Sequence, residues 1–302
     1  MAYIIARIGI DEIVRTFSGV SYPILLAGFG LFFLNYFFRS LRFRQLVVFR
    51  NVKLLPMFKI SCYYMALNYL LPARSGELSL PYLLKKREDI PVSQGVAVLV
   101  VARALDFLNV ALFLPFVVIL MWGGVGRQLL PATLGFFGLL AVCLSLLLLF
   151  TFRGETSLSV ARKLLSALHV ARFRVVEVLL DKLRDLQNSF RTIHFKNVYP
   201  RLFGLTVAIW LCVYAYVYLV ITSFGTSITL LGAVLVVLFM VPTRLFPIQG
   251  VGNFGSHEVG WSAALLLLGL SHERALAVAL SSHIVILVYI LVLVVVAHIA
   301  LR

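Results

Sequence analysis

Long apolar segments separated by short polar ones run through most of this sequence. Four are long enough for membrane-spanning helices, which need about 20 apolar residues. These four segments are Tyr22–Phe38, Pro131–Phe152, Leu202–Thr222 and Leu276–Leu301. A fifth segment, Val92–Trp122, is longer than a simple span and contains Arg103 and Asp106. We expect it to tilt or bend, and Pro115 can kink it.

Two further apolar regions are interrupted by polar sequence. In the first region, two apolar arms, Ile60–Leu71 and Leu78–Leu84, flank a polar centre at 72–77. In the second region, the arms are Ile228–Thr243 and Val259–Leu270, and the polar centre is 244–258. A helix over residues 60–71 rises about 18 Å at 1.5 Å per residue, less than the membrane core of about 30 Å. The regions are either soluble loops between ordinary spans or re-entrant hairpins with polar tips inside the bilayer. Irregular backbone at that depth must be covered by protein or line a wet cavity.

The distribution of basic residues favours hairpins. Segment 39–59 holds six basic residues and no acid, 153–201 holds ten basic residues against four acids, and Lys85–Arg87 is a third basic cluster. Cytoplasmic loops carry an excess of Lys and Arg, so we place all three on the cytoplasmic side. Residues 60–84 then enter and leave the membrane on one side.

The order span, hairpin, span occurs twice, in residues 22–122 and again in 202–301, with opposite orientation and with 131–152 as the connecting span. Such inverted repeats with broken helices are typical of transporters. We therefore predict an all-α polytopic membrane protein, with one transmembrane domain over 1–302 and a re-entrant hairpin in each repeat. We place it in the cell (inner) membrane, with the basic loops and the C-terminus cytoplasmic.

Two amphipathic segments complete this prediction. Residues 1–20 are expected to form an interfacial helix, and 153–201 a cytoplasmic amphipathic segment. The apolar residues of the second recur at spacings of three and four, which places them on one helix face: Val175, Leu179, Leu183, Leu186 and Phe190. This helix would lie on the membrane surface or pack against the bundle.

Composition excludes several classes of protein. The chain is 62% hydrophobic and 13% charged, whereas soluble domains are about 45–50% apolar and about 25% charged. A cytosolic enzyme, a disordered protein and a disulfide-rich secreted module are excluded. The net charge is +15, and the charged residues lie between apolar segments. The expected partner of this positive charge is therefore the layer of anionic lipid headgroups rather than nucleic acid. Cys62, Cys143 and Cys212 lack metal or redox spacing, and we expect them to pack in apolar surroundings.

Ionisable residues within the apolar regions are candidates for a functional site. Burying a charge in the membrane costs free energy, so such residues are usually paired or line a pathway. The candidates are Arg74, Glu77, Arg103, Asp106, Arg244 and Glu258. Arg103 and Asp106 share a helix face. They form either a neutralising pair or an arrangement in which Asp106 orients Arg103 toward a cavity.

The first polar centre contains Arg74, Gly76 and Glu77, with Asn68 before it. Pro72 ends the first arm, and Gly76 permits a tight backbone path. Either an Arg74–Glu77 pair holds this tip together, or Arg74 and a nearby helix N-terminus bind a phosphate.

The second polar centre is rich in glycine. Its predicted backbone loop contains Pro247, Gly250, Gly252 and Gly255, and its predicted cavity-lining residues are Gln249, Asn253, His257 and Glu258. The glycines do not form a nucleotide loop, because no Gly-Lys-Ser/Thr follows. His257 and Glu258 are adjacent, which is not a metal-ligand spacing on a helix, so we predict no metal and no cofactor. We expect His283 in the last span to be packed or bonded between helices.

Three motifs carry a family resemblance. They are Asn68-Tyr-Leu-Leu-Pro-Ala-Arg-Ser-Gly-Glu77 with a following Leu-Leu-Lys-Lys-Arg, then Arg103-Ala-Leu-Asp106, then Phe246-Pro-Ile-Gln-Gly-Val-Gly-Asn-Phe-Gly-Ser-His-Glu258. In order and spacing they resemble signatures of the lysylphosphatidylglycerol synthase transmembrane region family, over about residues 20–300. The third departs from the family pattern, because Asn253 and Phe254 are inserted before Gly255 and Ser-His precedes the glutamate.

The resemblance implies lipid handling. The family includes the flippase part of the bacterial multiple peptide resistance factor, which moves aminoacylated phosphatidylglycerol between leaflets. Stand-alone relatives are associated with isoprenoid lipids, hopanoids and glycolipid assembly. Aminoacyl transfer in the resistance factor belongs to a separate soluble domain, and this sequence has no room for one after its last span. Synthase activity is therefore not expected.

Three functions remain open. The first is a lipid flippase for an anionic or phosphate-bearing headgroup, including aminoacylated and isoprenoid lipids. Its headgroup would be neutralised by Arg74, Arg103 and Arg244, with Glu77, Asp106 and Glu258 orienting the arginines or binding an amine. The second is an embedded lipid-modifying enzyme with Glu258 and His257 as acid and base. The third is a scaffold for a lipid glycosyl- or acyltransferase.

We favour the flippase, a transporter rather than an enzyme. The expected partner is a membrane lipid, either an anionic phospholipid or a polyprenyl lipid. A lipid-synthesising enzyme and a second copy of the chain are further candidates. No nucleotide motif is present, so transport would be passive or ion-coupled, with Glu77 or Glu258 able to carry a proton.

Overall fold

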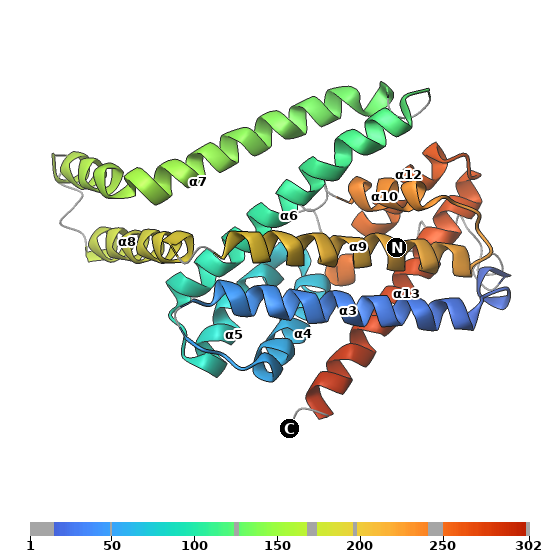
Figure 1. Cartoon of the computed structure of the whole chain (residues 1–302), viewed down its shortest axis with the longest axis horizontal. Coiled ribbons are helices and arrows are strands. Elements are labelled where there is room, and N and C mark those ends of the chain that lie inside the picture. Colours follow the sequence, from blue (N-terminus) through green and yellow to red (C-terminus); the bar gives the residue numbers. More distant parts are fainter. Residues whose placement is uncertain are drawn as a thin grey trace.

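The described part of the chain is helical throughout. The structure is a computed structural model, and it describes residues 15–48, 50–123, 127–167, 174–195, 198–240 and 250–299. The elements used below are α3 (Tyr22–Leu46), α4 (Leu54–Leu70), η1 (Pro72–Leu78), α5 (Ser79–Glu88), α6 (Val92–Leu120), α7 (Arg127–Ala167), α8 (Arg174–Phe195), α9 (Tyr199–Ser223), α10 (Leu230–Phe239), η3 (Val251–Asn253), α12 (Ser256–Leu267) and α13 (His272–Ile299). Within the described ranges no strand is present (Figure 1).

Five helices are long and apolar enough to cross a membrane. They are α3, α6, α9, α13 and the part of α7 from Leu129 to Arg153. Each overlaps one of the five predicted apolar segments, so the prediction of an all-α polytopic membrane protein is confirmed. Helix α6 continues through Pro115. Cys62 and Cys212 are buried, whereas Cys143 is exposed on the apolar span of α7.

Helix α3 extends beyond its predicted end. The apolar segment ends at Phe38, but the helix continues to Leu46 and buries Arg39 and Arg42. The physical reason is a buried carboxylate on α6, described below, which compensates these charges within the bundle.

Helices α3 and α9 form an antiparallel pair and lie side by side (Figure 1). The amide of Ser21, just before α3, donates to the carbonyl of Ser223 at the end of α9, at 2.9 Å. Further along, the Asn35 side chain donates to the carbonyl of Ile209, also at 2.9 Å. This pair forms one wall of the central core.

The first interrupted region folds as helix, tight turn and helix. Helix α4 begins at Leu54, earlier than the predicted arm at Ile60, and α5 packs back against it. The chain ends of this unit meet, because the Arg50 guanidinium donates to the carbonyl of Glu88. At the turn, a Cβ on Gly76 would overlap the backbone of α4, so only glycine allows this close approach.

The second interrupted region places α10 and α12 antiparallel. Gly232 near the start of α10 faces Leu268 after α12, and Gly260 within α12 faces Phe239 and Met240 at the end of α10. Residues 241–249, between α10 and η3, lie outside the described part. The two turns meet, because η1 contacts η3 and α4 also contacts η3.

Helix α7 has 41 residues and forms a hairpin with α8. Helix α8 packs on both α6 and α7, and Phe190 makes an edge contact with Phe150 at 6.1 Å between ring centres. Of the two open placements for the amphipathic segment, packing against the bundle is therefore observed for α8. The predicted interfacial helix over residues 1–20 lies outside the described part up to residue 14.

We expect Gly76→Ala to separate the first turn from α4. Overpacking usually costs about 1–3 kcal/mol, and here the clash is with backbone, which cannot rotate away. Thermal unfolding of the purified protein in detergent measures the loss. Gly30→Ala is the matched control, because Gly30 is exposed on α3 and a Cβ there meets nothing within 4 Å. Equal melting temperatures for the two variants would contradict the proposed close packing.

Candidate functional site

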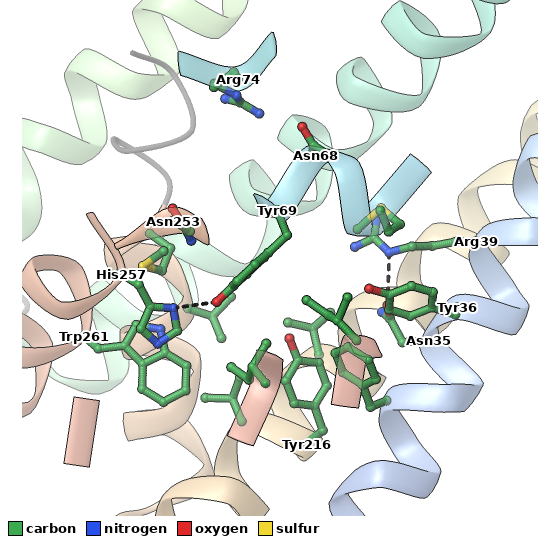
Figure 2. Close-up of a pocket in the computed structure, with 18 of the residues that line it drawn as sticks. Asn35, Tyr36, Arg39, Asn68, Tyr69, Arg74, Tyr216, Asn253, His257 and Trp261 are labelled. Atoms are coloured by element: carbon green, nitrogen blue, oxygen red, sulfur yellow. Dashed lines mark hydrogen bonds between the residues drawn. The ribbon is translucent and has the colours of Figure 1, made fainter. Parts of the chain in front are cut away.

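A cavity lies where the two turns approach the α3–α9 pair. Its volume is about 120 Å³. The polar and aromatic residues that line it are Phe32, Asn35, Tyr36, Arg39, Asn68, Tyr69, Arg74, Arg103, Tyr216, Asn253, His257 and Trp261. Figure 2 labels all of these except Phe32 and Arg103. Among the described lining residues, three are arginines and none is acidic.

Arg103 on α6 joins the first turn to the helix bundle. Its guanidinium lies 2.8 Å from one carboxylate oxygen of Glu77 and 3.1 Å from the other. Glu77 also pairs with Arg74 at 2.7 Å. The Tyr64 hydroxyl accepts from Arg103 at 2.6 Å and donates to Glu77 at 3.1 Å. The predicted Arg74–Glu77 pair is present, and Arg103 shares the same carboxylate.

Asp106, one turn further along α6, collects a second set of partners. Arg42 donates to it at 2.7 Å and Arg103 at 3.2 Å, and a nitrogen of Arg39 lies 4.0 Å away. The Trp210 indole N–H donates at 3.1 Å. The predicted Arg103–Asp106 pair is therefore one part of a buried network that joins α3, α6 and α9.

This network carries more positive than negative charge. Four guanidinium groups, from Arg39, Arg42, Arg74 and Arg103, face the two carboxylates of Glu77 and Asp106. All six side chains are at most 22% exposed. The described cluster therefore has two positive charges in excess, and Arg39, Arg74 and Arg103 present them to the cavity. Such a site attracts an anion.

The first turn holds Arg74 in an uncommon backbone conformation. Ala73 has a φ of 50° and Arg74 a φ of 57°, both in the left-handed region that side chains other than glycine rarely adopt. A conformation of this kind persists only when its surroundings enforce it. Here the pair with Glu77 and the close contact at Gly76 do so, and they fix Arg74 at the cavity.

The second turn is fastened by His283 of α13. One ring nitrogen faces the carbonyl of Gly252 at 2.8 Å, and the other faces a carboxylate oxygen of Glu258. A carbonyl only accepts, so the first nitrogen carries a hydrogen. One further proton is shared between the second nitrogen and Glu258. The other oxygen of Glu258 accepts from the Gly255 amide at 2.7 Å and caps α12. His283 is thus bonded between helices, one of the two predicted outcomes.

The structure divides the predicted site residues into three groups. Those that line the cavity are Asn68, Arg74, Arg103, Asn253 and His257. Those that lie behind the lining, and act on it through partners, are Glu77, Asp106 and Glu258. Arg244, Pro247 and Gln249 lie outside the described residues. Substrate binding by any of them stays a prediction.

The predicted backbone positions have distinct geometries. Pro72 begins η1, and a Cβ on Gly250 would collide with the carbonyl oxygen of Phe254 at 2.6 Å. Gly252 and Gly255 have φ values of 62° and 89°, as the prediction of a glycine-dependent loop requires.

Sequence reasoning missed several residues of the site. Arg39 and Arg42 were counted only among the basic residues of segment 39–59, which was placed on the cytoplasmic side. The aromatic lining residues Tyr36, Tyr69 and Tyr216 lie in apolar stretches where tyrosine gives no distinct signal. The Tyr69 hydroxyl lies 3.3 Å from a ring nitrogen of His257 and links the two turns (Figure 2). A tyrosine directly after Asn68, before the polar centre, was the one available clue.

The fold and the cavity define a multi-pass membrane protein with a buried, cationic polar site between broken helices. The chain belongs to the lysylphosphatidylglycerol synthase TM region family, whose model matches residues 1–294. The resemblance seen in the three motifs is thus confirmed over nearly the whole chain. Comparisons with curated protein sequences and with solved structures gave no match.

We expect Asp106→Asn to destabilise the protein severely. Breaking a buried ion pair by removing one partner costs roughly 3–5 kcal/mol, because the remaining charge is left buried. Unfolding in detergent, followed by tryptophan fluorescence, measures the change. Combining Asp106→Asn with Arg42→Gln should recover part of it. Asp89→Asn is the control, since Asp89 pairs with Lys85 at the surface and its pKa is lowered by that hydrogen bond. A control variant as unstable as Asp106→Asn would contradict this role.

We expect Glu258→Gln to keep the second turn intact and Glu258→Ala to loosen it. A glutamine accepts from the Gly255 amide and donates to His283, so it reproduces both bonds of the carboxyl group. The alanine variant loses the cap and leaves a buried histidine nitrogen unsatisfied, which costs about 1–3 kcal/mol. Hydrogen exchange of the α12 amides distinguishes them. Equal loss of protection in both variants would show that a full charge on Glu258 is required.

Proposed function

We propose that this protein moves an anionic, phosphate-bearing lipid headgroup across the bilayer. The observation that carries this proposal is the composition of the cavity lining. The described lining residues include three arginines and no acid, and the cavity lies inside an apolar helix bundle. Guanidinium groups bind phosphate with two parallel hydrogen bonds. Membership of a family named for a lipid synthase's membrane region supports a lipid as the cargo.

We also propose that the two interrupted regions are re-entrant hairpins. Helices α4, α5, α10 and α12 have 17, 10, 10 and 12 residues, fewer than the roughly 20 needed to cross the membrane core. Their turns are polar and meet at the cavity, the arrangement tolerated inside a bilayer only where protein or water covers the backbone.

The proposed inverted repeat rests on the order and direction of the elements. Residues 22–122 supply α3, the first hairpin and α6, and 202–301 supply α9, the second hairpin and α13. The first helix of each unit pairs with its counterpart in antiparallel fashion, through Ser21–Ser223 and Asn35–Ile209. This relation is expected if the units have opposite orientations in the membrane.

The proposed membrane orientation follows from the basic ends of the helices. The end of α3, the start of α6 and the start of α9 lie toward the same end of the molecule, beside α8 (left in Figure 1). Tyr63 connects Arg87 at the end of α5 with His298 near the end of α13. We propose that the protein lies in the inner (cell) membrane. The end of the molecule with these basic residues then faces the cytoplasm.

In the proposed transport step, the lipid phosphate competes with Glu77 for Arg103 and Arg74, while Arg39 contributes charge from α3. The cavity lining is rich in polar and charged side chains, which suits a headgroup rather than acyl chains. The chains therefore remain in the bilayer as the headgroup crosses. Of the two carboxylates considered as proton carriers, Glu258 is better suited, because it already shares a proton with His283, whereas Glu77 is bound to two arginines.

The two alternative functions fit the site less well. An enzyme using Glu258 and His257 as acid and base needs Glu258 at the substrate, but this carboxyl group is 1% exposed and caps α12. A scaffold for a lipid-synthesising enzyme, or a homo-oligomer, would use the exposed apolar face of α7 between Leu129 and Arg153. The scaffold role requires no cationic cavity, so variants of the arginines distinguish it from transport.

We expect Arg103→Ala and Arg74→Ala each to slow headgroup translocation about tenfold or more, since each removes a charge-assisted hydrogen bond worth about 1.4 kcal/mol or more. Proteoliposomes with fluorescent phosphatidylglycerol, quenched from outside by dithionite, measure the rate. Arg103→Lys keeps the charge and should retain intermediate activity.

The control for this experiment is Arg127→Ala, because Arg127 is exposed at the start of α7 and does not line the cavity. Melting temperatures identify variants that fail to fold. Wild-type rates in folded Arg74→Ala and Arg103→Ala proteins would refute the transport assignment and favour the scaffold.

A further inference from the structure

We propose that His283 and Glu258 form a proton-binding site that fastens the second turn to α13, and that loss of the shared proton at alkaline pH releases this turn. The second turn here means residues 250–258, which contain η3 and the start of α12. The inference goes beyond the proposed function, because it concerns what holds one wall of the cavity and not what the cavity binds.

The number of hydrogens available to the His283 ring carries the argument. One ring nitrogen lies 2.8 Å from the carbonyl oxygen of Gly252, and the other faces a carboxylate oxygen of Glu258. Both partners only accept when Glu258 is ionised, whereas a neutral imidazole has a single N–H. Both contacts are therefore hydrogen bonds only when the pair holds one more proton, either as an imidazolium beside a carboxylate or as an imidazole beside a carboxylic acid.

Loss of this proton leaves one contact without a hydrogen in either tautomer of the ring. If the remaining hydrogen points to Gly252, a nitrogen lone pair faces the carboxylate of Glu258. If it points to Glu258, the lone pair faces the carbonyl of Gly252. His283 and Glu258 are only 0% and 1% exposed, so solvent cannot replace the lost bond. The hold on the second turn is therefore present at low pH and is lost as the pH rises.

The backbone of the second turn depends on this hold. Gly252, Asn253 and Gly255 have φ values of 62°, 63° and 89°, all in the left-handed region. For asparagine this conformation is uncommon, and it persists where neighbouring contacts enforce it. His283 makes one such contact at Gly252, and Glu258 makes another by accepting from the Gly255 amide at 2.7 Å. Both contacts belong to the pair that shares the proton.

Titratable groups from several elements surround the pair. The His257 ring of α12 stacks on the His283 ring with centres 4.4 Å apart, and the Tyr69 ring of α4 meets it edge-on at 5.7 Å. Helix α10, which packs against α12, has no titratable side chain. The adjoining cavity adds groups from α3, η1, α6 and α9, namely Tyr36, Arg39, Arg74, Arg103 and Tyr216. Histidine is the residue type that changes charge near neutral pH, so the test must separate His257 from the pair.

Release of the second turn would alter the cavity. Asn253 and His257 lie on this turn and line the cavity. The Tyr69 hydroxyl of α4 also lies 3.3 Å from a ring nitrogen of His257 (Figure 2). This link to the first hairpin does not involve the shared proton and remains when the hold on α13 is lost. The pair is thus a switch between a turn held by both α13 and α4 and a turn held by α4 alone.

Amide hydrogen exchange of the full-length protein in detergent tests this inference. The exchange rates of the α12 amides are measured from about pH 6 to about pH 10 and divided by the intrinsic rate at each pH, which gives their protection. We expect the protection of α12 in the wild-type protein to fall about tenfold or more across this range. The protection of α9 should stay constant and serves as the internal reference.

The Glu258→Gln variant shows whether the pair is responsible. A glutamine oxygen accepts from the Gly255 amide and its NH₂ group donates to His283, so both contacts of His283 are made without a titrating proton. We expect this variant to keep high protection of α12 at every pH. His298→Gln is the matched control on the same helix, because His298 is exposed and contacts Tyr63 instead. This control should show the pH dependence of the wild-type protein.

Constant protection of α12 in the wild-type protein would overturn the inference. A loss of protection that persists in Glu258→Gln would overturn it as well, because His257 or another neighbour would then be the titrating group. His283→Ala should show low protection at every pH, and high protection in this variant would mean that the turn is held without the pair. Exchange is measured without added lipid, so these outcomes do not depend on the proposed function.

Discussion

Asp106 holds three helices at one point, and the candidate site depends on that junction. Its carboxylate pairs with Arg42 of α3 and with Arg103 of its own helix α6, and it accepts from Trp210 of α9. A lone carboxylate inside an apolar bundle would be prohibitively costly, and so would the arginines. The carboxylate and the arginines compensate each other's charge, so all of them can be buried. Helix α3 can therefore continue through Arg39 and Arg42 inside the bundle.

The position of the first turn follows from the same junction. Asp106 and Glu77 hold Arg103 from two sides, so the guanidinium cannot follow a different rotamer without losing a partner. Glu77 in turn fixes Arg74, despite its left-handed backbone. A chain of charge-assisted bonds therefore runs from the centre of the bundle to the tip of the first hairpin. The second tip is held by other means, through His283 and the capped start of α12.

Local patterns in the sequence predicted what depends on neighbours in the chain. The five spans follow from apolar length, and the pairs Arg74–Glu77 and Arg103–Asp106 follow from a spacing of three. The glycine positions follow from the backbone paths of the turns. These features agree with the structure because each depends on residues that are close together in the sequence.

Long-range partnerships could not be predicted in this way. Arg42 and Asp106 are 64 positions apart, and a count of basic residues treats Arg42 as a loop charge. Tyr69 and Tyr216 look like ordinary apolar residues until the helices bring them to one cavity. The pairing of Glu258 with His283 likewise needed the packing of α13 on α12.

The arginine network also restricts how this protein can evolve. Exchange of any one member leaves a buried charge without its partner, so viable changes there must occur in groups. The amide and phenol side chains of the lining are neutral, so exchange of Asn68 or Tyr216 leaves no buried charge behind. Under the proposed function, descendants of this sequence would keep the arginine network while changing the neutral part of the lining. On the same proposal, new cargo specificities would arise at the neutral side chains of the lining rather than at its arginines.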